Sequence, residues 1–238
     1  MPTETEVCNL ALGKIGGAGD ALGGNAFITS INGTDKVSAW CKLNFPRVRR
    51  RVIKDMAIAG APFKATVRFG DLGGEVTSLP ETGDWQYAFN LPGDCLMVVC
   101  QFDEANIAVR RQGNLYTNPT DVLLYQWELI ANSAGSGLLF LTDNLTNEDG
   151  DSAFIEYIID TPETGAWNEE MIDAVATLLA VEVCPTVGRD LKTSQALLIK
   201  YETLIKAKAR AANMRDFDNR SRYRPGYLGG RTSSLEGV

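Results

Sequence analysis

The sequence predicts an α+β protein with a four-helix unit built from both chain ends, an inserted antiparallel β-domain and an extended C-terminal tail. Near both ends of the 238-residue chain, apolar residues recur at steps of three and four, the spacing of amphipathic helices. From about residue 63 to residue 160 the period changes to two, with turn residues between the apolar runs, which is typical of β-strands. After Phe217 the periodicity is lost, which favours an extended or disordered segment.

The first predicted helix begins at Thr3, whose hydroxyl fits an N-cap, and Glu6 stands three residues later to complete a capping box. It ends at Gly16-Gly17, because glycine favours the backbone geometry that follows a helix C-terminus. A loop rich in glycine, asparagine and serine follows. A second, longer helix is predicted to begin at Thr34 or Asp35, since either side chain can serve as its N-cap.

Four arginines cluster in the second half of this longer helix, which is predicted to end at residues 60–62. One interpretation is a solvated helix face, and the other is a contact with a second subunit or with nucleic acid. The candidate inter-subunit residues are Arg47, Arg49, Arg50 and Arg51.

The middle of the chain is predicted to form strands, and its clearest segment is WQYAFNLPGDCLMVV at residues 85–99. Three aromatic residues alternate with small or polar ones there, Leu-Pro-Gly-Asp then breaks the strand, and an apolar run begins the next one. Residues 107–117 are predicted to form a hairpin. The predicted strands are Lys64–Phe69, Trp85–Leu91, Cys95–Phe102, Ile107–Arg111, Leu115–Thr117, Leu123–Leu129, Leu138–Leu141 and Ala153–Ile159.

Helical spacing returns after Thr161-Pro162, with one helix that includes Trp167 and is stopped by Pro185 and Gly188, and another predicted from Asp190 to about Met214. Each of the four helices has a single apolar stripe, and such stripes must be buried against partners. The simplest arrangement is one helical unit made from both chain ends. The predicted domains are residues 1–61 with 166–218 (helical), 62–165 (inserted β-domain) and 219–238 (basic tail).

Composition narrows the possible chemistry. The chain has no histidine, which excludes Ser-His and Cys-His nucleophile pairs and removes the commonest zinc ligand. Its five cysteines are odd in number and lack a CxxC spacing, which argues against a disulfide framework and a zinc ribbon. No apolar run is long enough to suggest a membrane helix. We therefore expect no cofactor, no metal site and no membrane contact.

Two acidic patterns leave alternatives open. The turn at residues 147–151 resembles part of a calcium loop but lacks the required order of ligands, so an acidic turn is favoured over a weak cation site. Asp84, Asp94, Glu128 and Glu156 could supply the carboxylate pair of a carbohydrate hydrolase, although nothing in the sequence pairs them.

Charge is unevenly distributed along the chain, whose net charge is −7. Between Lys206 and Arg231 there are eight basic residues and two acidic ones, and arginine alternates with tyrosine in the last part. This composition suits a docking peptide for another protein, with single-stranded nucleic acid or a passive tail as alternatives. The candidate partner-binding residues are Arg220, Arg222, Tyr223, Arg224, Pro225, Tyr227, Leu228 and Arg231.

Several motifs in order resemble the tail tubular protein A family, the head-to-tail adaptors of short-tailed phages. They are CNLALGKIG at residue 8, the Trp40, Cys41, Phe45-Pro46 and Arg49 to Arg51 pattern, WQYAFNLPGDCLMV, LYTN at residue 115, a Leu- and Ala-rich helix at 172–183, and KAKARAANMRD at residue 206. The chain departs from the family at residues 61–65, where APFKA replaces a W-x-F-A step, and after Asp218, where no family pattern is found.

The resemblance implies a non-enzymatic virion structural protein of the head–tail connector, assembled in the host cytoplasm. Such adaptors form twelve-subunit homo-oligomeric rings that join the portal protein to the tail nozzle protein and present surfaces to tail fibres. DNA passes through the ring without sequence-specific binding. By this resemblance, the basic tail would bind the portal. A tail-associated carbohydrate hydrolase and a nucleic-acid-binding module remain the alternatives.

Overall fold

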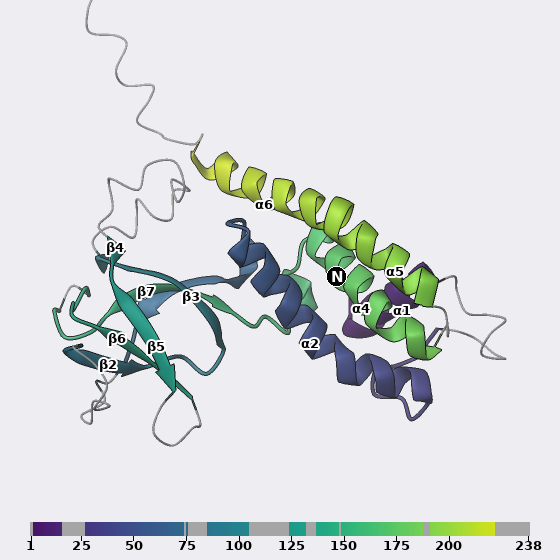
Figure 1. Ribbon diagram of the computed structural model, residues 1–238, viewed down its shortest axis with the longest axis horizontal. Helices are drawn as coiled ribbons and strands as arrows, with labels where there is room; N and C mark the ends of the chain where they lie inside the picture. Colours follow the sequence, from purple (N-terminus) through teal and green to yellow (C-terminus); the bar gives the residue numbers. More distant parts are fainter. Residues whose placement is uncertain are drawn as a thin grey trace, which may run out of the picture.

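A computed structural model describes most of the chain and shows a mixed α+β protein with helices from both chain ends and two small antiparallel sheets (Figure 1). The described residues are 2–15, 27–73, 75, 85–104, 124–131, 137–147, 149–187 and 191–221. The predicted hairpin at 107–117 therefore lies outside the described residues.

The helices bracket the strands in sequence, as predicted. The α-helices are α1 (Glu4–Lys14), α2 (Lys36–Ile58), α4 (Glu169–Val187), α5 (Leu191–Lys200) and α6 (Lys206–Ser221). A π-helical segment, η4 (Tyr201–Ile205), joins α5 to α6, so these three form one long helical run. Two short 3-10 helices are η1 (Lys64–Thr66) and η3 (Thr164–Ala166).

The strands form two sheets in which every described pair is antiparallel. The first sheet has the order β1-β7-β3-β4 and the second has the order β2-β6-β5. Phe89 lies opposite Phe140 in the second sheet, and both are buried. The strands are β1 (Val67–Asp71), β2 (Tyr87–Asn90), β3 (Cys95–Phe102), β4 (Leu124–Tyr125), β5 (Trp127–Ala131), β6 (Leu138–Thr142) and β7 (Phe154–Ile159).

The predicted N-termini of the first two helices, α1 and α2, are confirmed by their caps. The Thr3 hydroxyl accepts from the Glu6 backbone N–H, and the Glu6 carboxylate accepts from the Thr3 N–H, so the capping box is complete. Of the two candidates for α2, the cap is Asp35, whose carboxylate accepts from the Ser38 N–H. The hydrogen bonds from Ser38 lower the pKa of Asp35, because they stabilise its charged form.

The third helix ends at Val187, directly before the predicted stop at Gly188, but it continues through Pro185, the other predicted stop. Pro185 has no N–H for the carbonyl of Val181, and the Ser194 hydroxyl of α5 donates to that carbonyl at 2.9 Å instead. The neighbouring helix therefore supplies a hydrogen bond that proline removes.

Other boundaries also differ from the prediction. The start of the first predicted strand, Lys64–Thr66, is a 3-10 turn, in which the Thr66 N–H and hydroxyl both bond to the Phe63 carbonyl. The predicted strand Leu123–Leu129 is interrupted at Gln126, between β4 and β5. The last helix extends past Met214 to Ser221, so the first three residues of the predicted tail are helical. Residues 215–221 contain no glycine or proline, so the sequence has no strong stop signal between Met214 and the end of α6.

One apolar cluster includes buried residues of α1, α2, α4, α5, η4 and α6. We call it the helical core. Its helices pack mainly on α4, whose inward residues are fully buried. Phe45 of α2 stacks on Trp167, just before α4, with ring centroids 6.0 Å apart. Ile158 of β7 belongs to the same cluster, so the first sheet packs against the helices.

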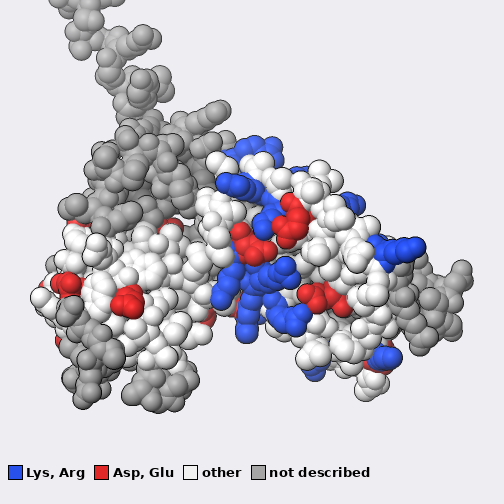
Figure 2. Space-filling view, in the orientation of Figure 1, with Lys and Arg blue, Asp and Glu red and all other residues white. Residues whose placement is uncertain are grey.

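The excess negative charge of the protein is concentrated in the inserted strand region and not in the helices. Residues 62–165 carry 16 Asp and Glu against four Lys and Arg, so the excess acid lies in the inserted region. Figure 2 shows basic side chains gathered over α2 and α6, with acidic ones among them. The acidic excess therefore belongs to the insert, whereas the basic segment predicted from the sequence begins in α6.

Candidate subunit interface

The arginine cluster of α2 lies where the inserted region returns to the helices. Arg49 donates from Nε and Nη2 to the two carboxylate oxygens of Asp160, at 2.7 and 2.8 Å. Asp160 directly follows β7, and its Oδ2 also accepts from Arg50 Nε at 2.7 Å. One carboxylate therefore holds two neighbouring arginines and joins α2 to the end of the insert.

Arg49 is enclosed by its surroundings. Its side chain is only 6% exposed, its guanidinium carbon lies 5.9 Å from the centre of the Phe45 ring, and Nη1 is 3.9 Å from the Glu4 carboxylate. Burial acts to raise the pKa of Asp160, but the hydrogen bonds and charges of Arg49 and Arg50 outweigh it and hold the pKa below its ordinary value. Asp160 is therefore ionised at neutral pH, and its ion pair with Arg49 is largely buried.

The remaining arginines of the cluster reach solvent. Arg47 and Arg51 lie 2.9 and 3.7 Å from the Glu182 carboxylate of α4, and Arg50 contacts Asp160 from its exposed side. The Arg47 side chain is 69% exposed, so most of its surface is free of intrachain contact. A role in subunit contacts stays a prediction for Arg47, Arg50 and Arg51, whereas Arg49 has almost no surface to offer a neighbour.

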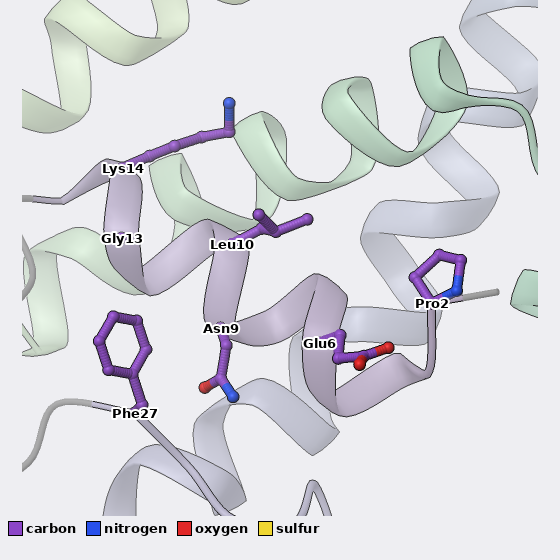
Figure 3. Close-up of a pocket in the computed structure, with 7 residues that line it drawn as sticks. All are labelled: Pro2, Glu6, Asn9, Leu10, Gly13, Lys14 and Phe27. Carbon is purple, nitrogen blue, oxygen red and sulfur yellow. The ribbon is translucent and has the colours of Figure 1, made fainter.

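A second surface feature follows the outer side of α1, where an open hollow of about 760 Å³ is lined by residues spaced along that helix (Figure 3). Leu10 and Phe27 contribute exposed apolar side chains to it. The Asn9 amide fixes one wall by donating to the Ile28 carbonyl and accepting from the Ile28 N–H. The lining residues are Pro2, Glu6, Asn9, Leu10, Gly13, Lys14 and Phe27.

The hollow and the carboxylate partners of the arginine cluster leave no pattern in the sequence that predicts them. Asp160 and Glu182 lie more than 100 residues from their arginine partners in the chain, so no local spacing connects them. Leu10 lies among the apolar residues of the first helix, but its side chain is exposed at the hollow and not buried in the core.

The predicted partner-binding tail is described only at its start. Arg220 belongs to the last turn of α6. The other candidates, from Arg222 to Arg231, lie outside the described residues. The structure therefore fixes where this segment leaves the helices, at Ser221.

The described candidate carboxylates of a hydrolase lie on different elements of the fold. Glu156 is fully buried in β7 of the first sheet. Glu128 is exposed on β5 of the second sheet, where it accepts a hydrogen bond from Trp85 Nε1 at 3.0 Å. Asp94 lies in the turn between β2 and β3, and Asp84 falls outside the described residues.

The acidic turn is closed by its own hydrogen bonds. The Asn147 side-chain oxygen accepts from the N–H groups of Asp151 and Ser152, and Gly150 adopts a φ of 70° that suits glycine. Within the described ranges, no three acidic or cysteine side chains are grouped closely enough to hold a metal ion.

Among the helices that the structure describes, none is long and apolar enough to cross a bilayer. In comparisons with known proteins, no protein-family model and no curated protein matched this chain.

Proposed function

We propose that this chain is a structural adaptor of a phage head–tail connector, a homo-oligomeric ring between the portal and the tail nozzle. In this proposal the four helical segments from both chain ends form the ring domain. The inserted strands face the nozzle or the fibres. DNA passes through the ring, and no step of the proposal requires catalysis.

The observation that carries the proposal is the shared helical core. Val7 of α1 and Ala209 of α6 belong to the same buried cluster, although they are 202 positions apart in the chain. The adaptor resemblance rests on motifs from both chain ends and from the strands between them. A fold that joins those ends in one body supports the view that the motifs belong to one module.

The charge distribution also favours this function over tight nucleic-acid binding. Strong binding to DNA depends on many Lys and Arg side chains that neutralise phosphates. The described arginines of α2 are instead paired with carboxylates of the same chain, and the insert is strongly acidic. Such a surface suits a channel through which DNA moves without being held.

The test is binding of the purified full chain to a phage portal protein, followed by sedimentation and electron microscopy. We expect a ring on the portal. Deleting residues 222–238, which follow α6, should preserve the helical circular-dichroism signal and weaken portal binding at least about tenfold, as expected for loss of a few anchor residues. Absence of any portal binding by the full chain would contradict the proposal, and normal binding by the shortened chain would contradict the role of the tail.

A further inference from the structure

The outer face of α5 exposes a row of large apolar side chains. Leu191 and Ile199 are 67% and 63% exposed, and Leu198 is partly exposed. Spacings of seven and eight residues place all three on one side of a helix. Ser194 and Leu197 are buried against the helical core, and Ser194 neighbours Leu191 and Leu198 on the helix surface. The row is therefore exposed beside the buried side of α5.

The hollow along α1 is suited to side chains of this kind. Leu10 and Phe27 supply apolar walls, and a Cβ built on Gly13 would meet nothing within 4 Å, so there is open space beside the helix. Figure 3 shows Leu10 and Phe27 on α1 and the segment beside it, with Lys14 directed to the neighbouring helix. Grooves of this type bind an apolar helix face through a few anchor side chains.

The two surfaces are not in contact within one molecule. Both α1 and α5 pack on α4, α1 through residues such as Val7 and Ala11 and α5 through Leu197. Leu191 and Ile199 are exposed and no α5 residue lines the open hollow, so the α5 row does not fill the α1 hollow of its own molecule. The proposed contact is therefore one between two copies.

Charges on the two helices complement each other. Before Lys14, α1 carries Glu4 and Glu6 and no basic residue. On α5, Lys200 is basic and residues 191–200 include no acidic residue. Glu4 is 3.9 Å from Arg49 and Lys14 is 2.6 Å from Asp173, so both of these charges have partners within the molecule. Glu6 of α1 and Lys200 of α5 therefore carry opposite charges on the two helices.

We propose that the α1 hollow binds the exposed α5 row, Leu191, Leu198 and Ile199, of a second copy of this chain. The contact is head-to-tail, because each copy offers one hollow and one row. Repetition of such a contact by a constant rotation closes a ring when the rotation divides a full turn. In this respect the inference rests on the proposed adaptor ring and names the surfaces that build it.

The experiment uses two single variants of the full chain, Leu10→Glu in the hollow and Ile199→Glu in the row. Both side chains are exposed, so the variants should keep the circular-dichroism spectrum and unfolding midpoint of the parent. Each variant alone should dissociate, with a dissociation constant raised at least about tenfold in sedimentation velocity. Ile58→Glu is the matched control, because Ile58 is 74% exposed at the end of α2 and belongs to neither surface.

Mixing the two variants distinguishes this contact from any other. The Leu10→Glu copy keeps an intact row and the Ile199→Glu copy keeps an intact hollow, so an equal mixture should form dimers and nothing larger. Assembly of either variant like the parent, a mixture that stays monomeric, or a parent that is monomeric both free and with portal would overturn the inference. A parent that assembles through these surfaces and fails to bind portal would overturn the adaptor function alone.

Discussion

Arg49 and Asp160 form a two-pronged ion pair that connects the middle of α2 to the residue after β7, 111 positions further along the chain. Arg49 is buried, and the Asp160 side chain is 12% exposed. Arg50 completes the group from the solvent side. The pair therefore joins the helical core to the point where the inserted strands end.

Arg49→Ala should destabilise the protein strongly. Loss of this guanidinium leaves a poorly solvated carboxylate with one exposed partner, and breaking a buried pair costs about 3–5 kcal/mol. We expect a decrease of about 3 kcal/mol in the free energy of unfolding in urea, at the low end of that range because Arg50 remains. Arg47→Ala is the control, and its exposed pair with Glu182 should contribute less than about 1 kcal/mol. Equal effects of the two substitutions would show that Arg49 is not a structural anchor.

The same pair predicts a loss of stability in acid. The pKa of Asp160 is held below its ordinary value of 3.8, so the folded state binds this proton less readily than the unfolded state. Its stabilising contribution is complete above 3.8 and is lost as the pH falls through the lowered pKa. Asp160→Asn lacks this titration. The difference in unfolding free energy between parent and variant should therefore shrink below about pH 4, and a difference that stays constant in acid would contradict the prediction.

Local signals in the sequence predicted the elements that depend on local contacts. The capping box of α1 needs only Thr3 and Glu6, which are three residues apart, and it is present. The strand Cys95–Phe102 was predicted with the bounds that β3 has, because turn residues define its start. Both features are set within one short segment, so their neighbours in space are also neighbours in sequence.

Features that depend on distant residues were missed or misplaced. The continuation of α4 through Pro185 involves Ser194, which lies on the next helix and replaces the donor that Pro185 lacks. The environment of Arg49 depends on Asp160, and no spacing rule connects residues so far apart. The hollow on α1 depends on which helix face α4 leaves open. All three features depend on contacts between segments that are distant in the chain, and a single sequence does not show which distant segments meet.

Ser194→Ala should be costly because of Pro185. The substitution leaves the Val181 carbonyl without the hydroxyl donor at 2.9 Å, and because this contact is partly buried we expect a cost of about 1 kcal/mol, the low end for an unsatisfied group. In a Pro185→Ala background, the backbone N–H of residue 185 can bond to that carbonyl, so the same substitution should cost less. A double-mutant cycle by urea unfolding measures this coupling. Thr203→Ala is the control, since its exposed hydroxyl bonds to Ile199 of its own helix. Additive effects of Ser194→Ala and Pro185→Ala would contradict the explanation given for α4.

Cysteine reactivity should separate Cys95 from the other thiols. Cys95 is partly exposed, whereas Cys8, Cys41, Cys100 and Cys184 are buried, and the hydrogen bond with Cys41 raises the pKa of Cys8. Burial raises the pKa of Cys95 to about 11, so at pH 8 only about one thiol in a thousand is ionised.

A thiol-specific reagent should therefore label one cysteine of the native protein first, and slowly. Because the thiolate is the reactive form, the rate should rise about tenfold for each unit of pH between 8 and 10. Cys95→Ser should remove this first phase, and Cys100→Ser, the matched control on the same strand, should leave it unchanged. The later phases should appear only in denaturant, since the four buried thiols need the core to open. A first phase that survives in Cys95→Ser would contradict the prediction, because it would show that one of the four buried thiols reacts in the native protein.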